Sequence, residues 1–323
     1  MAISQSDYPP DAVEAAKSVL VELVHVLGEY RGDMVIVGGW VPPLLMPDST
    51  GHVGSTDVDV ALNHLAGTDE AYARISESLR ANGYRQDEDQ PFIWYREVDA
   101  GDEKPVTVEV DFLAGEYGGR GKGHRTQHVQ DLRPRKARGA DLLFDDVEER
   151  DVEARLPSGA VDSVTVRVAG VAPYIVMKST ALDSRIKQKD AYDIWFVLAN
   201  YPGGMSAVVE EFTPFADHGL VLAAVAILED KFESPNHFGP ASVAEFLEQS
   251  GEEADLTKRD AFERVQALLA GLRRRAALNC ARIPRYSRHC REYRTGGHIT
   301  ELVHRSPEAA SARPGSVDPN PGD

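Results

Sequence analysis

An apolar run that stops at two glycines, and an alternation of aspartate and valine shortly after it, restrict how this chain can fold. The run is Met34–Val37, and the glycines are Gly38 and Gly39. Such a run indicates a buried strand that enters a tight turn, because glycine tolerates positive φ and lets backbone amides approach a phosphate closely. Asp57 and Asp59 alternate with valines, so a second strand carries both carboxylates on one face. The sequence therefore predicts a candidate anion-binding turn followed by an acidic strand.

Two carboxylates on one strand face are costly unless a cation lies between them. Mg²⁺ suits this position, and Mn²⁺ is the alternative, since Mg²⁺ takes oxygen ligands and usually also binds the phosphates of a substrate. A later segment, 105–113, is predicted to be another strand, in which Glu109 and Asp111 share a face. A further carboxylate can therefore lie beside Asp57 and Asp59 if the two strands are neighbours.

The order of these features is similar to that of a known superfamily. A strand, a Gly-Gly turn, a short helix and then Gly-Ser-x-Asp-x-Asp over 54–59 resemble the core of the polymerase-β-like nucleotidyltransferases. Within that superfamily the chain looks most like the AbiEii-type proteins, which are the toxins of type IV toxin–antitoxin pairs. The resemblance implies an α/β (α+β) fold, with a mixed sheet flanked by helices and a helical C-terminal domain.

A second stretch, 174–196, supports the same resemblance. A lysine, an alanine and an arginine precede a basic residue and Asp-x-x-Asp, as in the AbiEii-type pattern; these residues are Lys178, Ala181, Arg185, Lys189, Asp190 and Asp193. The chain departs from the commonest pattern in two places, because Lys189 stands where arginine is usual and Trp40 follows the glycines. These departures leave the base preference and the acceptor open.

The resemblance also implies roles for single residues in the second stretch. Lys178 would contact the nucleotide phosphates, as a compact charge on a long stem, and Asp190 would be an essential acid of the site. We expect Arg185 and Asp193 to hold two helices in register. The alternative interpretation of the same residues is an ordinary pair of charged helices.

The first stretch supplies the chemistry expected of nucleotidyl transfer. An in-line attack on an α-phosphorus with loss of pyrophosphate needs metal ions near both oxygens and donors for the triphosphate. We assign Asp57 and Asp59 as metal ligands, and Asp111 occupies the place of the third acid in the superfamily, where it would also act as general base. The amides of the two glycines, Gly38 and Gly39, and the hydroxyl of Ser55 would hold the β- and γ-phosphates.

Charge is distributed unevenly along the chain. The net charge is −17, yet segment 118–140 carries a local charge of +6 and segment 271–294 one of +7. Basic clusters on an acidic protein are typical of a site for a phosphate polymer, and five residues of the first cluster could guide an RNA acceptor: Lys122, Arg125, Arg133, Arg135 and Arg138. The alternative is that both segments pair with acidic residues of the same chain.

Hydrophobic periodicity predicts the order of elements. We expect a catalytic domain over 1–170, a mainly helical domain over 171–305 that completes the site, and a disordered tail over 306–323. Strands are predicted at 34–37, 57–60, 92–98, 105–113, 140–155 and 161–168. Helices are predicted at 11–30 with Asp11 as a cap, 42–46, 69–82, from Pro173 onward, 191–198, 205–212, 220–229, 242–249 and 258–280.

Function and location follow as expectations. The chain is predicted to transfer a nucleoside monophosphate from an NTP to a tRNA 3′ end, with an antitoxin as its partner. No signal peptide or membrane-spanning run is evident, so we expect a cytoplasmic protein without a membrane partner. Two alternatives stay open, namely nucleotidylation of a small hydroxyl compound and a catalytically idle module that binds NTP or a partner protein.

Overall fold

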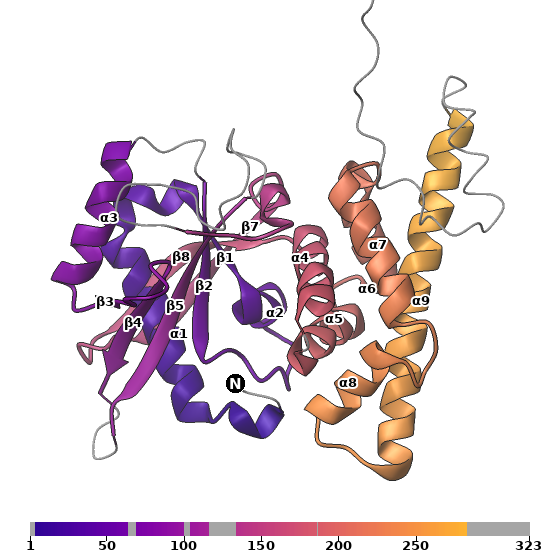
Figure 1. Cartoon of the computed structure of the whole chain (residues 1–323), viewed down its shortest axis with the longest axis horizontal. Coiled ribbons are helices and arrows are strands. Elements are labelled where there is room, and N and C mark those ends of the chain that lie inside the picture. The colour runs from indigo at the N-terminus through magenta and orange to yellow at the C-terminus, as the bar shows by residue number, and fades with distance from the viewer. Residues whose placement is uncertain (1–3, 64–68, 100–103, 116–133, 186, 283–323) are drawn as a thin grey trace, which may run out of the picture.

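The computed structural model describes residues 4–63, 69–99, 104–115, 134–185 and 187–282. In these residues eight strands form one mixed sheet with the order β3-β4-β5-β2-β1-β8-β7, and β6 pairs with β5. Helices lie on both sides of the sheet, and a group of helices follows it in the chain (Figure 1). The strands are β1 Met34–Val37, β2 Asp57–Leu62, β3 Arg85–Gln86, β4 Ile93–Val98, β5 Val106–Ala114, β6 Arg135–Lys136, β7 Val147–Arg155 and β8 Val161–Ala169.

The centre of the sheet is built from β1, β2 and β5. All four residues of β1 are buried, as expected for an apolar strand with neighbours on both edges. β1 pairs with β2 in antiparallel orientation and with β8 in parallel orientation. β2 pairs with β5 in parallel orientation. The two strands that carry the predicted acids are therefore neighbours.

The two faces of β2 and β5 differ because side chains alternate along a strand. Val58 lies opposite Val110, which lies opposite Trp94 of β4, and all three side chains are buried. Helix α1 covers this apolar face, and Arg96 of β4 reaches Glu22 of α1 with 2.8 Å between Nε and Oε2. The aspartates consequently lie on the opposite face of the sheet.

The helices before the last strand of the sheet include α1 Pro10–Val26, α2 Val41–Leu45 and α3 Asp69–Ala81. Short 3-10 turns η1 to η5 cover Gln5–Asp7, Gly28–Asp33, Gly38–Trp40, Ala140–Leu142 and Thr213–Phe215. The helices after the sheet are α4 Val171–Ser184, α5 Gln188–Asn200, α6 Gly204–Glu211, α7 Gly219–Lys231, α8 Phe238–Phe246 and α9 Gly251–Arg282. None of the helices in the described ranges combines the length and apolar character needed to cross a bilayer.

Several predicted elements are confirmed. The strand at 34–37 is β1, the acidic strand is β2, and the pair 92–98 and 105–113 forms the antiparallel β4 and β5. Helix α3 ends just before Gly83, whose φ of +84° suits a helix terminus. The mixed sheet flanked by helices, followed by helices, agrees with the predicted α/β class.

Other boundaries were wrong. α1 ends at Val26, and its N-cap residue is Pro9 rather than Asp11, which lies in the first turn. The segment 140–155 is a strand only from Val147, because a 3-10 turn precedes it. Pro173 lies inside the first turn of α4 and does not begin it, a position where a missing N–H costs nothing.

The C-terminal helices also differ from prediction in extent. α8 begins and ends earlier than 242–249, and α9 begins earlier than residue 258. β3 and β6 were not predicted, since two residues give no periodicity. The last strand ends at Ala169 and α4 begins at Val171, while the division into two domains at residue 170 stays a prediction. The tail 306–323 lies outside the described residues.

Candidate active site

The register of β2 against β5 brings the predicted acids together. Asp59 lies opposite Asp111, and Asp57 lies opposite Glu109. Neighbouring strands are about 4.8 Å apart, and paired residues point to the same side. Four carboxylates therefore occupy two adjacent rows on one face of the sheet.

Asp111 is the most buried of these acids, with 7% of its surface exposed. One of its oxygens, Oδ2, accepts a hydrogen bond of 2.6 Å from Nη2 of Arg135, and the other, Oδ1, is buried and has no hydrogen-bond partner among the residues that the structure describes. Burial raises the pKa of Asp111 to about 7, and the charge of Asp59 adds to the rise against the opposing charge of Arg135. Burial, followed by the charge of Asp57, raises the pKa of Asp59 to about 6. The positive charge of Arg135 therefore does not offset the burial and mutual repulsion of Asp59 and Asp111.

The Gly-Gly turn lies directly against them. Gly38 has a φ of +67°, and a Cβ at this position would collide with the carboxylate of Asp59. A Cβ at Gly39 would lie 2.5 Å from Oγ of Ser55 and 3.0 Å from Nζ of Lys189. Only glycine allows this approach without strain, so the turn, the hydroxyl and the lysine form one wall beside the acids.

Two side chains fix the N-terminal end of β2. The hydroxyl of Ser55 donates a hydrogen bond to Oδ1 of Asp57. The indole of Trp40 donates from Nε1 to the backbone oxygen of Asp57 over 2.9 Å. Trp40 follows the glycines directly, so this bond ties the turn to the acidic strand.

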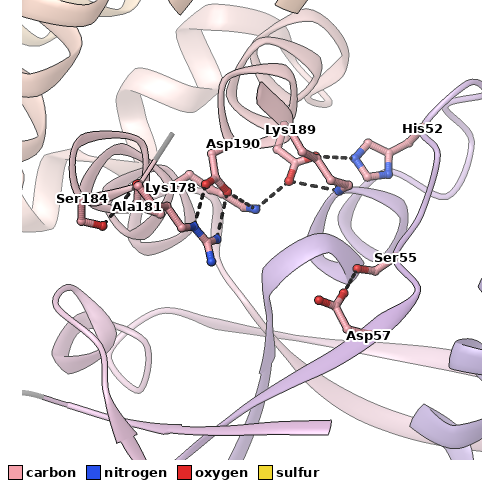
Figure 2. A network of polar contacts seen from close by, with 10 residues as sticks. His52, Ser55, Asp57, Lys178, Ala181, Ser184, Lys189 and Asp190 are labelled. Carbon is pink, nitrogen blue, oxygen red and sulfur yellow. Dashed lines mark hydrogen bonds and ion pairs between the residues drawn. The ribbon is translucent and has the colours of Figure 1, made fainter. Parts of the chain in front are cut away.

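A second polar network joins α4 to α5. Nζ of Lys178 lies 2.9 Å from Oδ1 of Asp190 and 2.7 Å from Oδ2 of Asp193. Arg185 donates from Nε to Oδ2 of Asp190 over 3.0 Å, and Lys189 lies 2.9 Å from Oδ1 of Asp193. Figure 2 shows this network, with Ser55 and Asp57, the first residue of β2, beside it. Three cations thus surround two buried aspartates.

Charge compensation controls ionisation in this network. Burial alone would raise the pKa of Asp193, but Lys178 and Lys189 hold it well below its usual value. Burial would lower the pKa of Lys178, but Asp190 and Asp193 keep it well above its ordinary value. For Lys189, burial outweighs the opposing charge of Asp193 and lowers the pKa.

His52 closes the network from the loop that leads to β2. Its Nε2 lies 3.0 Å from Oδ1 of Asp193, and its Nδ1 accepts a hydrogen bond of 3.0 Å from the amide of Gly54. A neutral ring with its proton on Nε2 satisfies both contacts. Burial accordingly lowers the pKa of His52 to about 4.

No family model and no curated protein matches this chain. Function is therefore inferred from the arrangement of the residues. The structure brings one group of predicted site residues together at the end of β2, namely Gly38, Gly39, Ser55, Asp57, Asp59 and Asp111. Lys178 and Asp190 belong to the adjacent network, and both are already engaged in ion pairs.

The acids fit a divalent cation by their chemistry. Within the described ranges, no three histidine, cysteine, aspartate or glutamate side chains form a group that could hold a metal ion as they stand. Oδ1 of Asp111 is nevertheless buried without a hydrogen-bond partner among the described residues, and it lies beside Asp59, whose pKa is raised. A cation here would offset the cost of burying the charged carboxylates and would remove their mutual repulsion. Asp57, Asp59 and Asp111 would hold it.

Three residues of the site, Glu109, Arg135 and His52, were not predicted to belong to it. Glu109 shares the period of two with Asp111, so the sequence held that signal. Arg135 was expected to guide RNA, which stays a prediction, and its guanidinium contacts Asp111. Nothing in the sequence around His52 indicates that it would contact Asp193.

The basic segments are only partly described. Lys122, Arg125 and Arg133 lie outside the described residues. In the second segment, Arg273 lies 2.5 Å from Glu229, and Arg275 pairs with Glu210. For these two arginines of α9 the structure supports pairing with acids of the same chain.

Proposed function

We propose that this chain is a metal-dependent nucleotidyltransferase of the AbiEii type, within the polymerase-β-like superfamily. It moves a nucleoside monophosphate from an NTP to a hydroxyl acceptor. The observation that carries the proposal is the pairing of Asp59 with Asp111 in parallel strands, next to a glycine turn that accepts no side chain. Acids on adjacent strands beside backbone amides are what such a transfer requires.

The reaction forms one bond and breaks one bond. The acceptor oxygen bonds to the α-phosphorus, the bond between that phosphorus and the α,β-bridging oxygen breaks, and pyrophosphate leaves with the electron pair. Asp111 takes the proton of the attacking hydroxyl. Its place on β5, opposite Asp59 of β2, supports this role.

The remaining residues bind and orient the substrate. The amides of Gly38 and Gly39, with the hydroxyl of Ser55, hold the β- and γ-phosphates. Mg²⁺ or Mn²⁺ bound by the three aspartates would neutralise charge on the phosphate oxygens and lower the pKa of the attacking hydroxyl.

The cationic network supplies positive charge on the side of the turn. Nζ of Lys189 is close to Gly39, and the charges of Lys178 and Arg185 oppose the rise in the pKa of Asp59 that burial and Asp57 cause. Lys178 would contact a phosphate while it stays paired with Asp190. Asp190 supports the site by holding Lys178 and Arg185 in place.

The biological assignment follows from the resemblance of the sequence. The acceptor is the 3′ end of a tRNA, and the protein is the toxin of a type IV pair whose antitoxin is a separate protein. The pairing of acids supports the chemistry, and a transfer assay identifies the acceptor.

The test is transfer from labelled NTPs to bulk tRNA in the presence of Mg²⁺. We expect labelled RNA with the wild type, loss of labelling after chelation, and a decrease of at least a hundredfold with Asp59→Asn, in which a ligand of the ion is removed. A matched control is Asp255→Asn on α9, which replaces an exposed carboxylate and should keep full activity.

Two results would contradict the proposal. Labelling that survives Asp59→Asn would exclude the acids as the catalytic centre. NTP binding without transfer to tRNA, to other RNA or to small hydroxyl compounds would indicate a binding module instead. Transfer to a small compound alone would support the transferase activity and would exclude tRNA as the acceptor.

A further inference from the structure

The acidic face of the sheet continues beyond the carboxylates, across β5, β4 and β3. Asp57 lies opposite Glu109, Glu109 lies opposite Tyr95, and Tyr95 lies opposite Arg85. Paired residues point to the same side of a sheet. One row of side chains therefore leads away from the site, and with strands about 4.8 Å apart Arg85 is roughly 14 Å from Asp57.

Two arginine–aromatic pairs occupy this part of the face. The guanidinium carbon of Arg85 lies 5.0 Å from the ring centroid of Tyr95, and that of Arg135 lies 5.8 Å from the ring centroid of Phe92. Both rings are partly exposed, and the hydroxyl of Tyr95 is fixed by Asp87 over 3.1 Å. We refer to Arg85, Phe92, Tyr95 and Arg135 as the Arg–aromatic surface.

Arg135 has unused capacity to bind an anion. Its side chain is 39% exposed, and among the described residues its guanidinium donates to Asp111 from Nη2 alone. Its Nε is buried without a partner. A guanidinium has five donors in a planar arrangement that matches a phosphate. Arg135 could thus keep its contact with Asp111 and bind a phosphate as well.

The direction of the reaction assigns this surface to one substrate. The proposed phosphate contacts, Gly38, Gly39 and Ser55, lie on the β1 side of the acids, and Lys189 lies with them. In-line transfer puts the entering oxygen opposite the leaving pyrophosphate. With the triphosphate on the β1 side, the acceptor approaches over β5 and β4.

We infer that the Arg–aromatic surface binds the acceptor, and that this acceptor is the single-stranded 3′ end of a nucleic acid. The inference rests on the proposed function. Arg135 binds the phosphate next to the attacking hydroxyl, and Tyr95 and Phe92 stack against bases, while Arg85 neutralises a phosphate further along. Rings combined with cations bind single strands with little sequence preference. A small hydroxyl compound without a phosphate would offer no anion for Arg135 to bind.

The experiment measures binding of two short fluorescent oligoribonucleotides by the full chain. Both end in a free 3′ hydroxyl, and in one of them a neutral methylphosphonate replaces the last phosphodiester. For Arg135→Gln we expect about tenfold weaker binding of the natural probe and unchanged binding of the neutral probe. Tyr95→Ala should weaken both probes about five- to a hundredfold through lost stacking, whereas Tyr95→Phe should bind almost normally.

The control is Arg155→Gln, which removes the same charge from β7, at the other edge of the sheet. Its binding should stay within twofold of the wild type. The inference is overturned if Arg135→Gln weakens both probes equally, or if Tyr95→Ala binds as the wild type does. Thermal unfolding of each variant separates lost binding from lost folding.

Transfer assays on the same variants separate this inference from the proposed function. Arg135→Gln should raise KM for the oligoribonucleotide about tenfold and leave KM for the NTP within twofold. If the wild type binds the probes as expected but transfers no label, the proposed function fails and the binding surface stands. If the variants transfer label with an unchanged KM for RNA, the Arg–aromatic surface does not bind the acceptor, and the proposed transferase function is retained.

Discussion

Two groups of aspartates lie next to each other in this protein, and they are compensated to different degrees. Asp190 and Asp193 are buried among two lysines, an arginine and a histidine, and their pKa values are lowered. Among the described residues, Asp111 has one direct arginine contact, from Arg135, and the pKa values of Asp59 and Asp111 are raised. The first group holds two helices together, whereas the second retains repulsion that a bound cation would remove. The same residue type is therefore a structural anchor in one place and a candidate ligand in the other.

The comparison is tested most strongly by Asp193→Asn. This change leaves Lys178 and Lys189 buried without their shared carboxylate, so we expect the free energy of unfolding to fall by about 3–5 kcal/mol. Urea unfolding followed by circular dichroism measures it. Asp255→Asn, which removes the exposed partner of Lys258, should unfold at the wild-type urea concentration. Equal midpoints for the two variants would show that the network is not an anchor.

The pH dependence of stability tests the histidine in the same network. The pKa of His52 is about 4 in the folded protein and about 6.5 in an unfolded chain. Between these values only the unfolded chain takes up the proton. The contribution of neutral His52 to the free energy of unfolding is therefore complete above pH 6.5 and declines as the pH falls towards 4.

Comparison with His52→Gln isolates that contribution. Acidification over this window should cost the wild type about 2–3 kcal/mol more free energy of unfolding than it costs the variant. Urea unfolding at several pH values gives both curves. The raised pKa values of Asp59 and Asp111 act in the opposite direction in both proteins and cancel in the difference. Parallel curves would mean that folding does not lower the pKa of His52.

For Asp59→Asn we expect a change in the free energy of unfolding that is opposite in sign to that of Asp193→Asn. At pH 7.5 the ionised Asp59 is repelled by Asp57 and disfavoured by burial, so a neutral amide should raise the free energy of unfolding by roughly 1–3 kcal/mol. Activity should disappear in the same variant. A loss of stability like that of Asp193→Asn would remove the distinction between the two groups.

Divalent cations should affect the two groups differently. Millimolar Mg²⁺ or Mn²⁺ should stabilise the wild type by about 1–2 kcal/mol through binding to the folded state. Thermal unfolding with and without the ion measures the shift. Asp59→Asn should show a much smaller shift, and Ca²⁺-free chelated samples provide the baseline. An equal shift in both proteins would place the ion elsewhere.

The smallest effect concerns the attachment of the acidic strand. Trp40→Phe removes the hydrogen bond from the indole to the backbone oxygen of Asp57, which should cost about 1 kcal/mol. Urea unfolding detects this change, and Trp195→Phe, which breaks the bond to Asp260 on α9, is the matched control. Only the first variant should also lower transfer activity.

Local patterns in the sequence were sufficient for the central strands. The apolar run Met34–Val37 and the alternation around Asp57 predict β1 and β2 because burial on both faces or on one face leaves a direct trace in composition. The pairing of Asp59 with Asp111 was available only as an implication of the resemblance, since register depends on residues far apart in the chain. The sequence therefore suggested which acids matter and left their geometry open.

Contacts between distant segments account for what sequence reasoning missed. Arg135 belongs to a strand of two residues, and its place beside Asp111 depends on the pairing of β6 with β5. His52 reaches Asp193 across 141 positions, so no spacing rule could have found it. Lys189 was noted as a departure from the common pattern, while its closeness to Gly39 is a result of how α5 packs.

The candidate site draws on segments between Gly38 and Asp193, and its two acidic strands, β2 and β5, are separated by more than forty positions in the sequence. Pairing of such distant strands is slow, because the intervening chain must first close into a loop. During synthesis the first aspartates leave the ribosome well before α5 does. A partly made chain would therefore lack the proposed site, which would be complete only once translation has passed α5 and the sheet has closed.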